Sequence, residues 1–249
     1  MLKKSKIVNY AQRAIGLAAN PYSLYVRSQG GIADLYNRLN APWFYQLEID
    51  TLLDIGGNIG LFSKTVRVLL PNAQIYAFEP LPSCYKEMNI NMGGEDNKYQ
   101  GFNCGLGEKN EDLIIEQSNY APSSSFLQMG EKHKEHFPHT SQSKQLTVPV
   151  KRLDDITKNL DLGSNLMIKV DVQGFEDKVL SGGLETFSKA KLLIIELSYQ
   201  ELYKDQPLFD KIYQPLITLG FQFHGTMAQM PDPKTGELLD ADCIFIKTG

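Results

Sequence analysis

From about residue 50 onward, the sequence alternates between short apolar runs and amphipathic segments. Alternation of this kind predicts strands separated by helices, and it favours a parallel sheet with helices on both faces. We expect the seven main strands at 51–55, 74–79, 99–104, 166–172, 192–198, 221–225 and 243–247. Helices are expected near 59–69, 82–92, 175–187 and 208–219.

The connection between the last two strands constrains the topology further. MAQMPDPKTGELLDAD (227–242) is short for a crossover helix and contains Pro231, Pro233 and Gly236. A hairpin connects such strands more simply, and it makes the last strand antiparallel to its neighbour. The chain is therefore predicted to form a mostly parallel seven-stranded sheet with an antiparallel C-terminal hairpin, in an α/β fold.

Two further regions surround this framework. Residues 1–48 predict an N-terminal helical extension, and residues 49–249 predict the main domain. Within that domain, 111–117 and 146–150 suggest an added strand pair. The polar stretch 119–144 is long for a structureless loop, so we expect it to form a lid or a substrate loop.

The first residues suggest a basic amphipathic helix. Lys3, Lys4, Lys6 and Arg13 alternate with apolar side chains at helical spacing. The favoured expectation is a helix packed on the domain or in a homodimer, and the alternative is peripheral membrane contact.

Charge and cysteine content limit the classes of function. A formal net charge of −4 lacks the overall positive charge that is typical of nucleic-acid-binding proteins. The three cysteines, Cys84, Cys104 and Cys243, are widely spaced without a CxxC pair, which argues against a disulfide framework or a thiolate zinc site. We expect a reducing, cytoplasmic setting.

A glycine-rich turn follows the first strand in LLDIGGNIGLFS (52–63). Asp54 ends the apolar run, and Gly56, Asn58 and Gly60 precede a helix whose first N–H groups lack internal partners. At the carboxyl edge of a parallel sheet, this pattern predicts a nucleotide-type site. A dinucleotide fingerprint needs glycines at i, i+2 and i+5, but here those positions are Gly56, Asn58 and Leu61. A dinucleotide-dependent oxidoreductase is thus the weaker alternative.

Carboxylates also end two other predicted strands. Glu79 ends the second strand, where its two oxygens could accept ribose hydroxyls, and Pro80 then turns the chain away. Asp171 ends the fourth strand, in LMIKVDVQGFEDKVLSGG (166–183), and should lie next to the first strand.

These segments together resemble one enzyme family. Asp54-x-Gly56-x-Asn58-x-Gly60 resembles the first motif of class I S-adenosylmethionine-dependent methyltransferases. The chain is similar to the FkbM family of these enzymes over about residues 50–247. The segments that carry the resemblance are LLDIGGNIGLFS, YAFEP, FNCGLGE, APSSSFL, VKRLDDI, IKVDVQGFEDKVLSGG, LIIELS and DCIFIK.

The resemblance implies a Rossmann-like class I methyltransferase sandwich, with S-adenosyl-L-methionine as the methyl donor. It implies O-methylation of a hydroxyl on a sugar, a glycan or another small metabolite. Asn103 would lie near the adenine, and Asp171 near the reacting centre. The cofactor-binding residues implied are Asp54, Gly56, Asn58, Gly60, Glu79, Pro80 and Asn103.

One position departs from the family pattern. The family usually has Glu directly before the glycine that follows Asp171, whereas this chain has Gln173. An amide cannot accept a proton as a base. The alternative function is therefore a catalytically weak binding or scaffold protein with the methyltransferase fold.

Transfer of a methyl group to a hydroxyl requires alignment of the oxygen and removal of its proton. The candidate catalytic residues are Asp171, Glu196 and His136, although Asp171 could instead organise its turn and His136 could belong to a solvated loop. We favour a reaction without a metal, with Mg²⁺ held by Asp171 and Glu196 as the alternative.

Three residues are predicted to contact the acceptor. They are Ser124, Ser125 and Gln173. The two serines could also simply build a turn.

Overall fold

The computed structural model describes residues 21–94, 98–130, 133, 142–232 and 234–247. The expectations for the basic N-terminal helix and for His136 fall outside these residues. They therefore stay predictions, as does homodimerisation. Within the described ranges, no helix combines the length and the apolar character that a membrane crossing requires.

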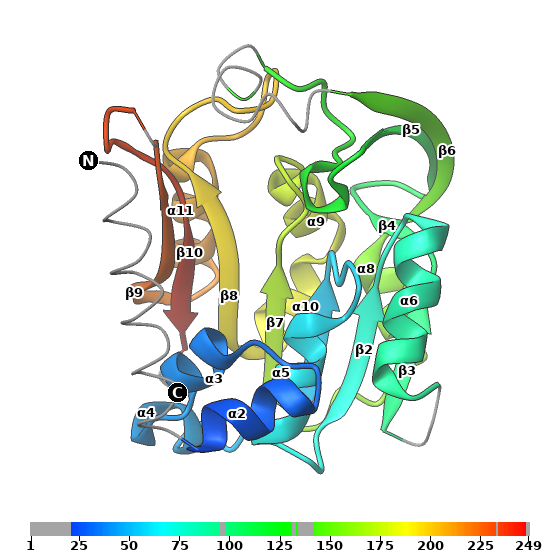
Figure 1. Ribbon diagram of the computed structural model, residues 1–249. Helices are drawn as coiled ribbons and strands as arrows, with labels where there is room; N and C mark the ends of the chain where they lie inside the picture. Colours follow the sequence, from blue (N-terminus) through cyan, green and yellow to red (C-terminus); the bar gives the residue numbers. More distant parts are fainter. Residues whose placement is uncertain (1–20, 95–97, 131–132, 134–141, 233, 248–249) are drawn as a thin grey trace, which may run out of the picture.

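A seven-stranded sheet forms the centre of the molecule (Figure 1). Its order is β3-β2-β1-β7-β8-β10-β9. The first five of these strands are parallel, and β10 runs antiparallel to both β8 and β9. The prediction of a mostly parallel sheet with an antiparallel hairpin is confirmed, and the arrangement is a Rossmann-like methyltransferase fold. The strands are β1 (Thr51–Ile55), β2 (Gln74–Phe78), β3 (Tyr99–Phe102), β7 (Leu166–Val170), β8 (Ala190–Ser198), β9 (Gln222–Pro231) and β10 (Leu238–Ile246).

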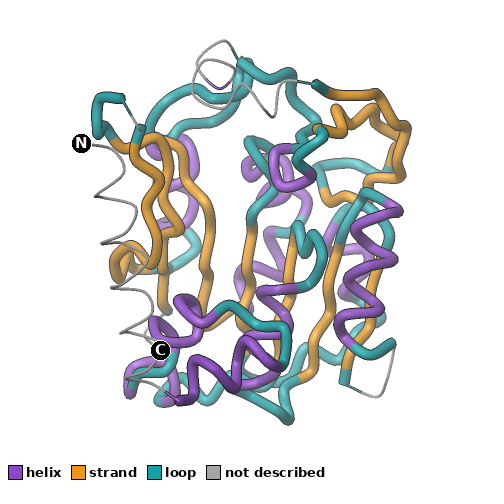
Figure 2. Tube along the Cα trace, viewed as in Figure 1, coloured by secondary structure: helices purple, strands orange, loops and turns teal. Residues whose placement is uncertain are grey.

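The central strands are buried on both faces, which explains why their sequences read as continuous apolar runs. Every residue of β1 and β7 is buried. Helices cover the two faces (Figure 2) and enclose two apolar cores. One face carries α2 (Pro21–Ser28), α3 (Ala33–Leu39), α4 (Pro42–Tyr45), α5 (Leu61–Leu69) and α6 (Pro82–Met92). The other carries α8 (Leu153–Thr157), α9 (Glu176–Gly182), α10 (Leu184–Lys189) and α11 (Phe209–Thr218).

The N-terminal helices share the core of the main sheet. Val26, Leu39 and Phe44 are buried in the same cluster as Leu52 of β1. The backbone N–H of Ile32 also donates to the hydroxyl of Thr65 at 2.8 Å, which fixes the start of α3 against α5. Residues 21–48 are therefore packed onto the sheet through α5.

The helix expected at 175–187 is in fact two helices, α9 and α10. The break falls at Gly182 and Gly183. A Cβ atom built on Gly182 would lie 1.9 Å from the carbonyl oxygen of Gly107, so the chains approach too closely for any side chain. Close packing with a distant segment thus interrupts the helical pattern.

The C-terminal hairpin is longer than expected. Strands β9 and β10 extend into the segment predicted as the connection, and the turn occupies only 232–237. Its ends are joined by a hydrogen bond from the N–H of Asp232 to the carbonyl of Glu237 at 2.7 Å. The prediction of a hairpin is right, but its loop is much shorter.

A second, three-stranded sheet lies beside the main one (Figure 1). It contains β4 (Gly105–Leu106), β5 (Glu111–Ser118) and β6 (Ser143–Lys151). β5 and β6 form the predicted added strand pair, and the structure shows that they run antiparallel. The short 3-10 helix η1 (Ala121–Ser123) follows β5 and contributes to the wall of the site described below.

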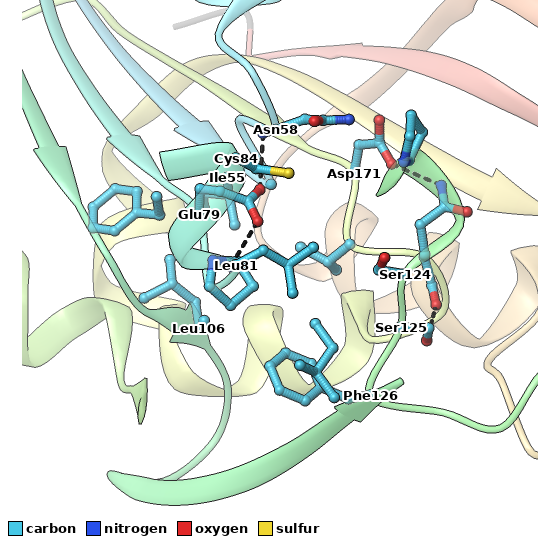
Figure 3. Close-up of a pocket in the computed structure, with 18 of the residues that line it drawn as sticks. Ile55, Asn58, Glu79, Leu81, Cys84, Leu106, Ser124, Ser125, Phe126 and Asp171 are labelled. Carbon is cyan, nitrogen blue, oxygen red and sulfur yellow. Dashed lines mark hydrogen bonds between the residues drawn. The ribbon is translucent and has the colours of Figure 1, made fainter. Parts of the chain in front are cut away.

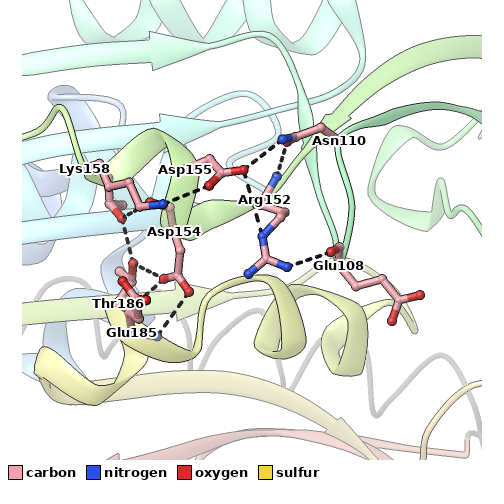
Figure 4. A network of polar contacts seen from close by, with 9 residues as sticks. Glu108, Asn110, Arg152, Asp154, Asp155, Lys158, Glu185 and Thr186 are labelled. Carbon is pink, nitrogen blue, oxygen red and sulfur yellow. Dashed lines mark hydrogen bonds and ion pairs between the residues drawn. The ribbon is translucent and has the colours of Figure 1, made fainter.

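A polar network fastens α8 to the start of α10 (Figure 4). The buried carboxylate of Asp154 accepts hydrogen bonds from the N–H of Thr186 at 2.9 Å, its hydroxyl at 2.7 Å and the N–H of Glu185 at 3.2 Å. Gly183, at the N-cap position of α10, has no side chain to do this. Asp154 of the VKRLDDI segment therefore has a structural role, because it caps the start of α10.

Candidate active site

The carboxyl ends of β1, β2, β7 and β8 surround a cavity of about 230 Å³ (Figure 3). It brings together most of the residues predicted to form the site. Those that line it are Gly56, Asn58, Glu79, Pro80, Ser124, Ser125, Asp171, Gln173 and Glu196. Asp54, Gly60 and Asn103 do not line it.

Glycine is required at the first turn of the loop after β1. Gly56 has φ of 75°, and a Cβ atom there would lie 1.8 Å from the carbonyl oxygen of Asp171. The N–H groups of Gly56 and Gly57 donate to the carbonyl of Phe78 at 3.0 and 2.9 Å. The loop is therefore pressed between the ends of β7 and β2, with its backbone against the cavity.

Glu79 organises the far side of this loop. Its Oε2 accepts the N–H of Asn58 and its Oε1 accepts the N–H of Leu81, both at 2.9 Å. Burial raises the pKa of Glu79 to about 7, although these hydrogen bonds favour the charged form. Each carboxylate oxygen retains acceptor capacity for a ligand hydroxyl.

Asn103 acts on the backbone behind Glu79. Its side-chain amide donates to the carbonyl of Glu79 at 2.9 Å and to that of Pro80 at 3.1 Å. It therefore holds the turn that presents Glu79, and it does not itself reach the cavity.

Asp54 is fully buried and faces an internal partner. Its Oδ2 accepts the hydroxyl of Ser63 at 2.6 Å, and its Oδ1 lies 3.5 Å from the ammonium of Lys169. Lys169 thus supplies the positive charge that the buried carboxylate of Asp54 requires.

Lys169 is not among the residues predicted from sequence. Its ammonium donates to the carbonyl of Gly56 at 2.8 Å and lies 3.6 Å from Asp171. Burial would lower the pKa of Lys169, but Asp171 and Asp54 outweigh it and raise the pKa above its usual value. A charged residue inside an apolar strand, two positions before Asp171 and so on the same face, is the signal that could have identified it.

Gln173 joins the two candidate catalytic carboxylates. Its amide nitrogen donates to Asp171 at 2.9 Å and to Glu196 at 2.8 Å. Its amide oxygen accepts the hydroxyl of Tyr203 at 2.9 Å. Both N–H donors and the carbonyl are used, whereas a glutamate would place a third carboxylate between Asp171 and Glu196.

Tyr203 was also not predicted. It follows β8, is 2% exposed, and its N–H donates to the side-chain oxygen of Gln206 at 2.6 Å. Burial, followed by the charge of Glu196, raises the pKa of Tyr203. His133, from the predicted lid segment, packs its ring 5.1 Å from that of Tyr203. Because Tyr203 is far from Gln173 in sequence, only the fold reveals their contact.

The two carboxylates have different surroundings. Burial raises the pKa of Glu196 well above its usual value, and the charges of Asp171 and Asp240 add to this effect. The side chain of Asp171 is 37% exposed and lies beside Lys169. Glu196 is thus the buried carboxyl group of the pair, whereas Asp171 is partly exposed and has a cationic neighbour.

The serines predicted to bind the acceptor also hold their own loop. Ser125 donates its hydroxyl to the carbonyl of Gln173 at 2.6 Å, and the hydroxyl of Ser124 accepts the N–H of Ser118 at 3.0 Å. Phe126 packs against Phe175 with ring centroids 5.0 Å apart. This loop is thus anchored to the turn that carries Gln173.

The expected Mg²⁺ alternative requires Asp171 and Glu196 to share an ion. In the part of the chain that the structure describes, no group of three or more His, Cys, Asp or Glu side chains is arranged to hold a metal. The amide nitrogen of Gln173 lies between the two carboxylates.

Comparison with known proteins places this site in a family. Residues 54–223 match the methyltransferase FkbM domain. The chain is 31% identical over 161 residues to 2-O-methyltransferase NoeI of Sinorhizobium fredii, covering 62% of this chain and 66% of that protein. It is 31% identical over 153 residues to methyltransferase sdnD of Sordaria araneosa, covering 53% of this chain and 59% of that protein.

A third relative is hexuronic acid methyltransferase AglP of Haloferax volcanii. It is 25% identical over 150 residues, which cover 60% of this chain and 56% of that protein. The chain spans less than two thirds of the length of each of these three relatives. The family model nevertheless covers more than half of the sequence. The chain therefore belongs to the FkbM methyltransferase family.

Proposed function

We propose that this protein is an S-adenosylmethionine-dependent O-methyltransferase that acts on a hydroxyl of a sugar, a glycan or another small metabolite. The observation that carries the proposal is the cavity itself. It places the Gly56 loop and Glu79 beside Asp171 and Glu196. The names of two relatives, a 2-O-methyltransferase and a hexuronic acid methyltransferase, support an oxygen acceptor on a sugar.

The residues present fit the cofactor. Glu79 offers two oxygens to ribose hydroxyls, and the bare backbone at Gly56 allows close approach of a ligand. Leu81, Leu106 and Phe126 give the same cavity an apolar wall suited to an adenine ring. When bound, the cofactor supplies an electrophilic methyl group on a sulfonium sulfur.

The carboxylates would then handle the proton of the acceptor. Asp171, which lines the cavity, would accept the proton that the acceptor hydroxyl loses on methylation. The ammonium of Lys169 lies 3.6 Å from Asp171 and would help to hold this carboxylate in position. Glu196, which lines the same cavity, would hydrogen-bond the acceptor and orient it.

The scaffold alternative depended on Gln173. Its amide makes contacts with Asp171, Glu196 and Tyr203 that a carboxylate could not make in the same way. Gln173 is thus integrated into this site, and its presence does not favour loss of activity.

The first test is calorimetric titration of the protein with S-adenosylhomocysteine, with NAD⁺ as the control. We expect binding of the former alone, lost in Glu79→Ala. Asp171→Asn should keep that binding but lose methyl transfer to sugar acceptors. Mass spectrometry of the sugar acceptor measures the transfer. A folded protein that does not bind S-adenosylhomocysteine would refute the proposal.

A further inference from the structure

An outer cavity of about 290 Å³ lies beside the active-site cavity, and Ser125 lines both. In Figure 3, Ser125 lies on the same side of the active-site cavity as Asp171 and away from Glu79. The outer cavity therefore adjoins the side of the site that is remote from the carboxylate proposed to bind ribose. Its polar lining residues are Glu116, Ser123, Ser125, Gln128, Ser143 and Tyr203.

Hydrogen bonds connect the outer cavity to the candidate catalytic carboxylates. The hydroxyl of Tyr203 donates to the amide oxygen of Gln173 at 2.9 Å. The amide nitrogen of Gln173 donates in turn to Asp171 at 2.9 Å and to Glu196 at 2.8 Å. An acceptor whose reacting hydroxyl lies at these two carboxylates would thus have its remaining part close to the outer cavity.

The walls of the outer cavity are held by backbone hydrogen bonds. The N–H of Glu116 donates to the carbonyl of Ser125 at 2.9 Å, and the N–H of Ser125 donates to the carbonyl of Glu116 at 3.3 Å. On the other side, the N–H of Lys204 donates to the carbonyl of Gln128 at 2.8 Å. A ligand would therefore meet a preformed surface, which reduces the entropy lost on binding.

The size of the active-site cavity also favours a second compartment. Its volume of about 230 Å³ is below the range of roughly 300–1,000 Å³ that is usual for small-molecule sites. The nucleoside of the donor would occupy the part beside Glu79. Little space then remains beyond that for the group that reacts, so a larger acceptor has to extend out of this cavity.

The lining of the outer cavity suits a neutral sugar ring. The carboxylate of Glu116 accepts the hydroxyl of Ser143 at 2.7 Å and the side-chain amide of Gln145 at 2.8 Å, and its oxygens retain capacity for ring hydroxyls. Leu127 and Met129 add apolar surface for the face of a ring. No Lys or Arg is among the described residues that line this cavity, so an anionic ring would face Glu116 without a compensating cation.

We propose that the outer cavity is an acceptor subsite, which binds a neutral sugar ring linked to the ring that is methylated, and that Glu116 discriminates against acidic rings at this position. The inference rests on the proposed function and narrows it, because it makes the acceptor an oligosaccharide or a glycan. The reacting hydroxyl itself would lie in the active-site cavity, at Asp171 and Glu196.

The test measures transfer of tritiated methyl from S-adenosylmethionine to an array of matched monosaccharides, disaccharides and trisaccharides. Each set shares its terminal ring, and the second ring is either a neutral sugar or a uronic acid. Ser143→Trp fills the outer cavity from β6. Thr147→Trp is the matched control, because Thr147 is also exposed on β6 but lines neither cavity.

We expect labelling of neutral disaccharides or trisaccharides to exceed that of the matched monosaccharides by about tenfold or more. Ser143→Trp should remove this advantage by raising KM for the longer acceptors, whereas Thr147→Trp should retain it. Glu116→Gln should increase labelling of acceptors whose second ring is a uronic acid, an effect that a merely structural role of Glu116 would not produce. Calorimetry should show unchanged binding of S-adenosylhomocysteine in all three variants.

Four results would overturn the inference. They are equal labelling of monosaccharides and longer acceptors, an advantage of longer acceptors that survives Ser143→Trp, weaker binding of S-adenosylhomocysteine in that variant, and no labelled sugar although the wild type binds S-adenosylhomocysteine. Failure of the wild type to bind S-adenosylhomocysteine is a different outcome, because it refutes the proposed function and this inference with it.

Discussion

The side-chain amide of Gln173, in the turn after β7, donates a hydrogen bond at 2.8 Å to the carboxylate of Glu196, which lies in β8. The same nitrogen reaches Asp171 at 2.9 Å. A neutral donor thus holds together two acidic groups that would otherwise repel each other. This relationship makes Gln173 a positioning residue whose replacement should affect both charge and geometry.

Gln173→Glu should lower kcat at neutral pH by about tenfold, because a third carboxylate would face Asp171 and Glu196 without a proton to donate. Activity should partly recover as the pH is lowered and one of these groups takes up a proton. The groups around it are Asp171, Glu196 and Tyr203, with Lys169 and Glu176 close by.

The pH profiles of kcat for wild type and variant measure this effect, with Tyr203→Phe as the control that removes a hydrogen bond without adding charge. A Gln173→Glu variant that is faster than the wild type at every pH would show instead that a carboxylate here is catalytic.

Lys169→Met should destabilise the fold by about 3 kcal/mol, since it leaves the buried carboxylate of Asp54 without its cation. Urea unfolding measures the loss. Lys178→Met is the matched control, because the ammonium of Lys178 also lies within 3.6 Å of carboxylates but its side chain is 39% exposed. Equal losses in the two variants would contradict the role given to burial.

Affinity for S-adenosylhomocysteine should rise between about pH 6 and pH 8. Burial raises the pKa of Glu79 to about 7, and its charged form accepts ribose hydroxyls more strongly. The same raised pKa means that Glu79 stabilises the fold below its unfolded pKa, and that this contribution is lost as the pH rises through 7. Binding and stability should therefore respond to pH in opposite directions.

Calorimetric titrations across this pH range, repeated with Glu79→Gln, test the assignment. The variant should bind more weakly at pH 8 and with little dependence on pH. An unchanged pH dependence in Glu79→Gln would place the titrating group elsewhere.

Asp154→Ala should lower the stability by about 1–2 kcal/mol, because the buried cap of α10 is removed. Thermal unfolding would show a reduced Tm with unchanged binding of S-adenosylhomocysteine. Asp155→Ala, on the exposed side of the same network, should leave Tm nearly unchanged. If loss of Asp154 reduced binding but not Tm, its role as a helix cap would be wrong.

Local patterns were sufficient to predict the sheet. Strand 51–55 was predicted at its observed bounds because a buried parallel strand is apolar throughout, and the terminal hairpin followed from turn residues. The break between α9 and α10 falls at the Gly182-Gly183 pair, which is a local signal for a helix end, but the close approach to Gly107 that requires these glycines depends on tertiary packing. The contacts of Lys169 with Asp54 and Gly56, and of Tyr203 with Gln173, also join residues that are remote in sequence, and they form only when the strand ends converge.

The position of β10 within the sheet has a consequence for synthesis. It lies between β8 and β9, yet it follows both in the chain. When β9 leaves the ribosome, β10, which pairs with both β8 and β9, has not yet emerged. Cys243 and Phe245 of β10 are fully buried, so their side of the core stays open until then. This half of the sheet must therefore close last, after a period in which β8 offers an unpaired edge to other chains.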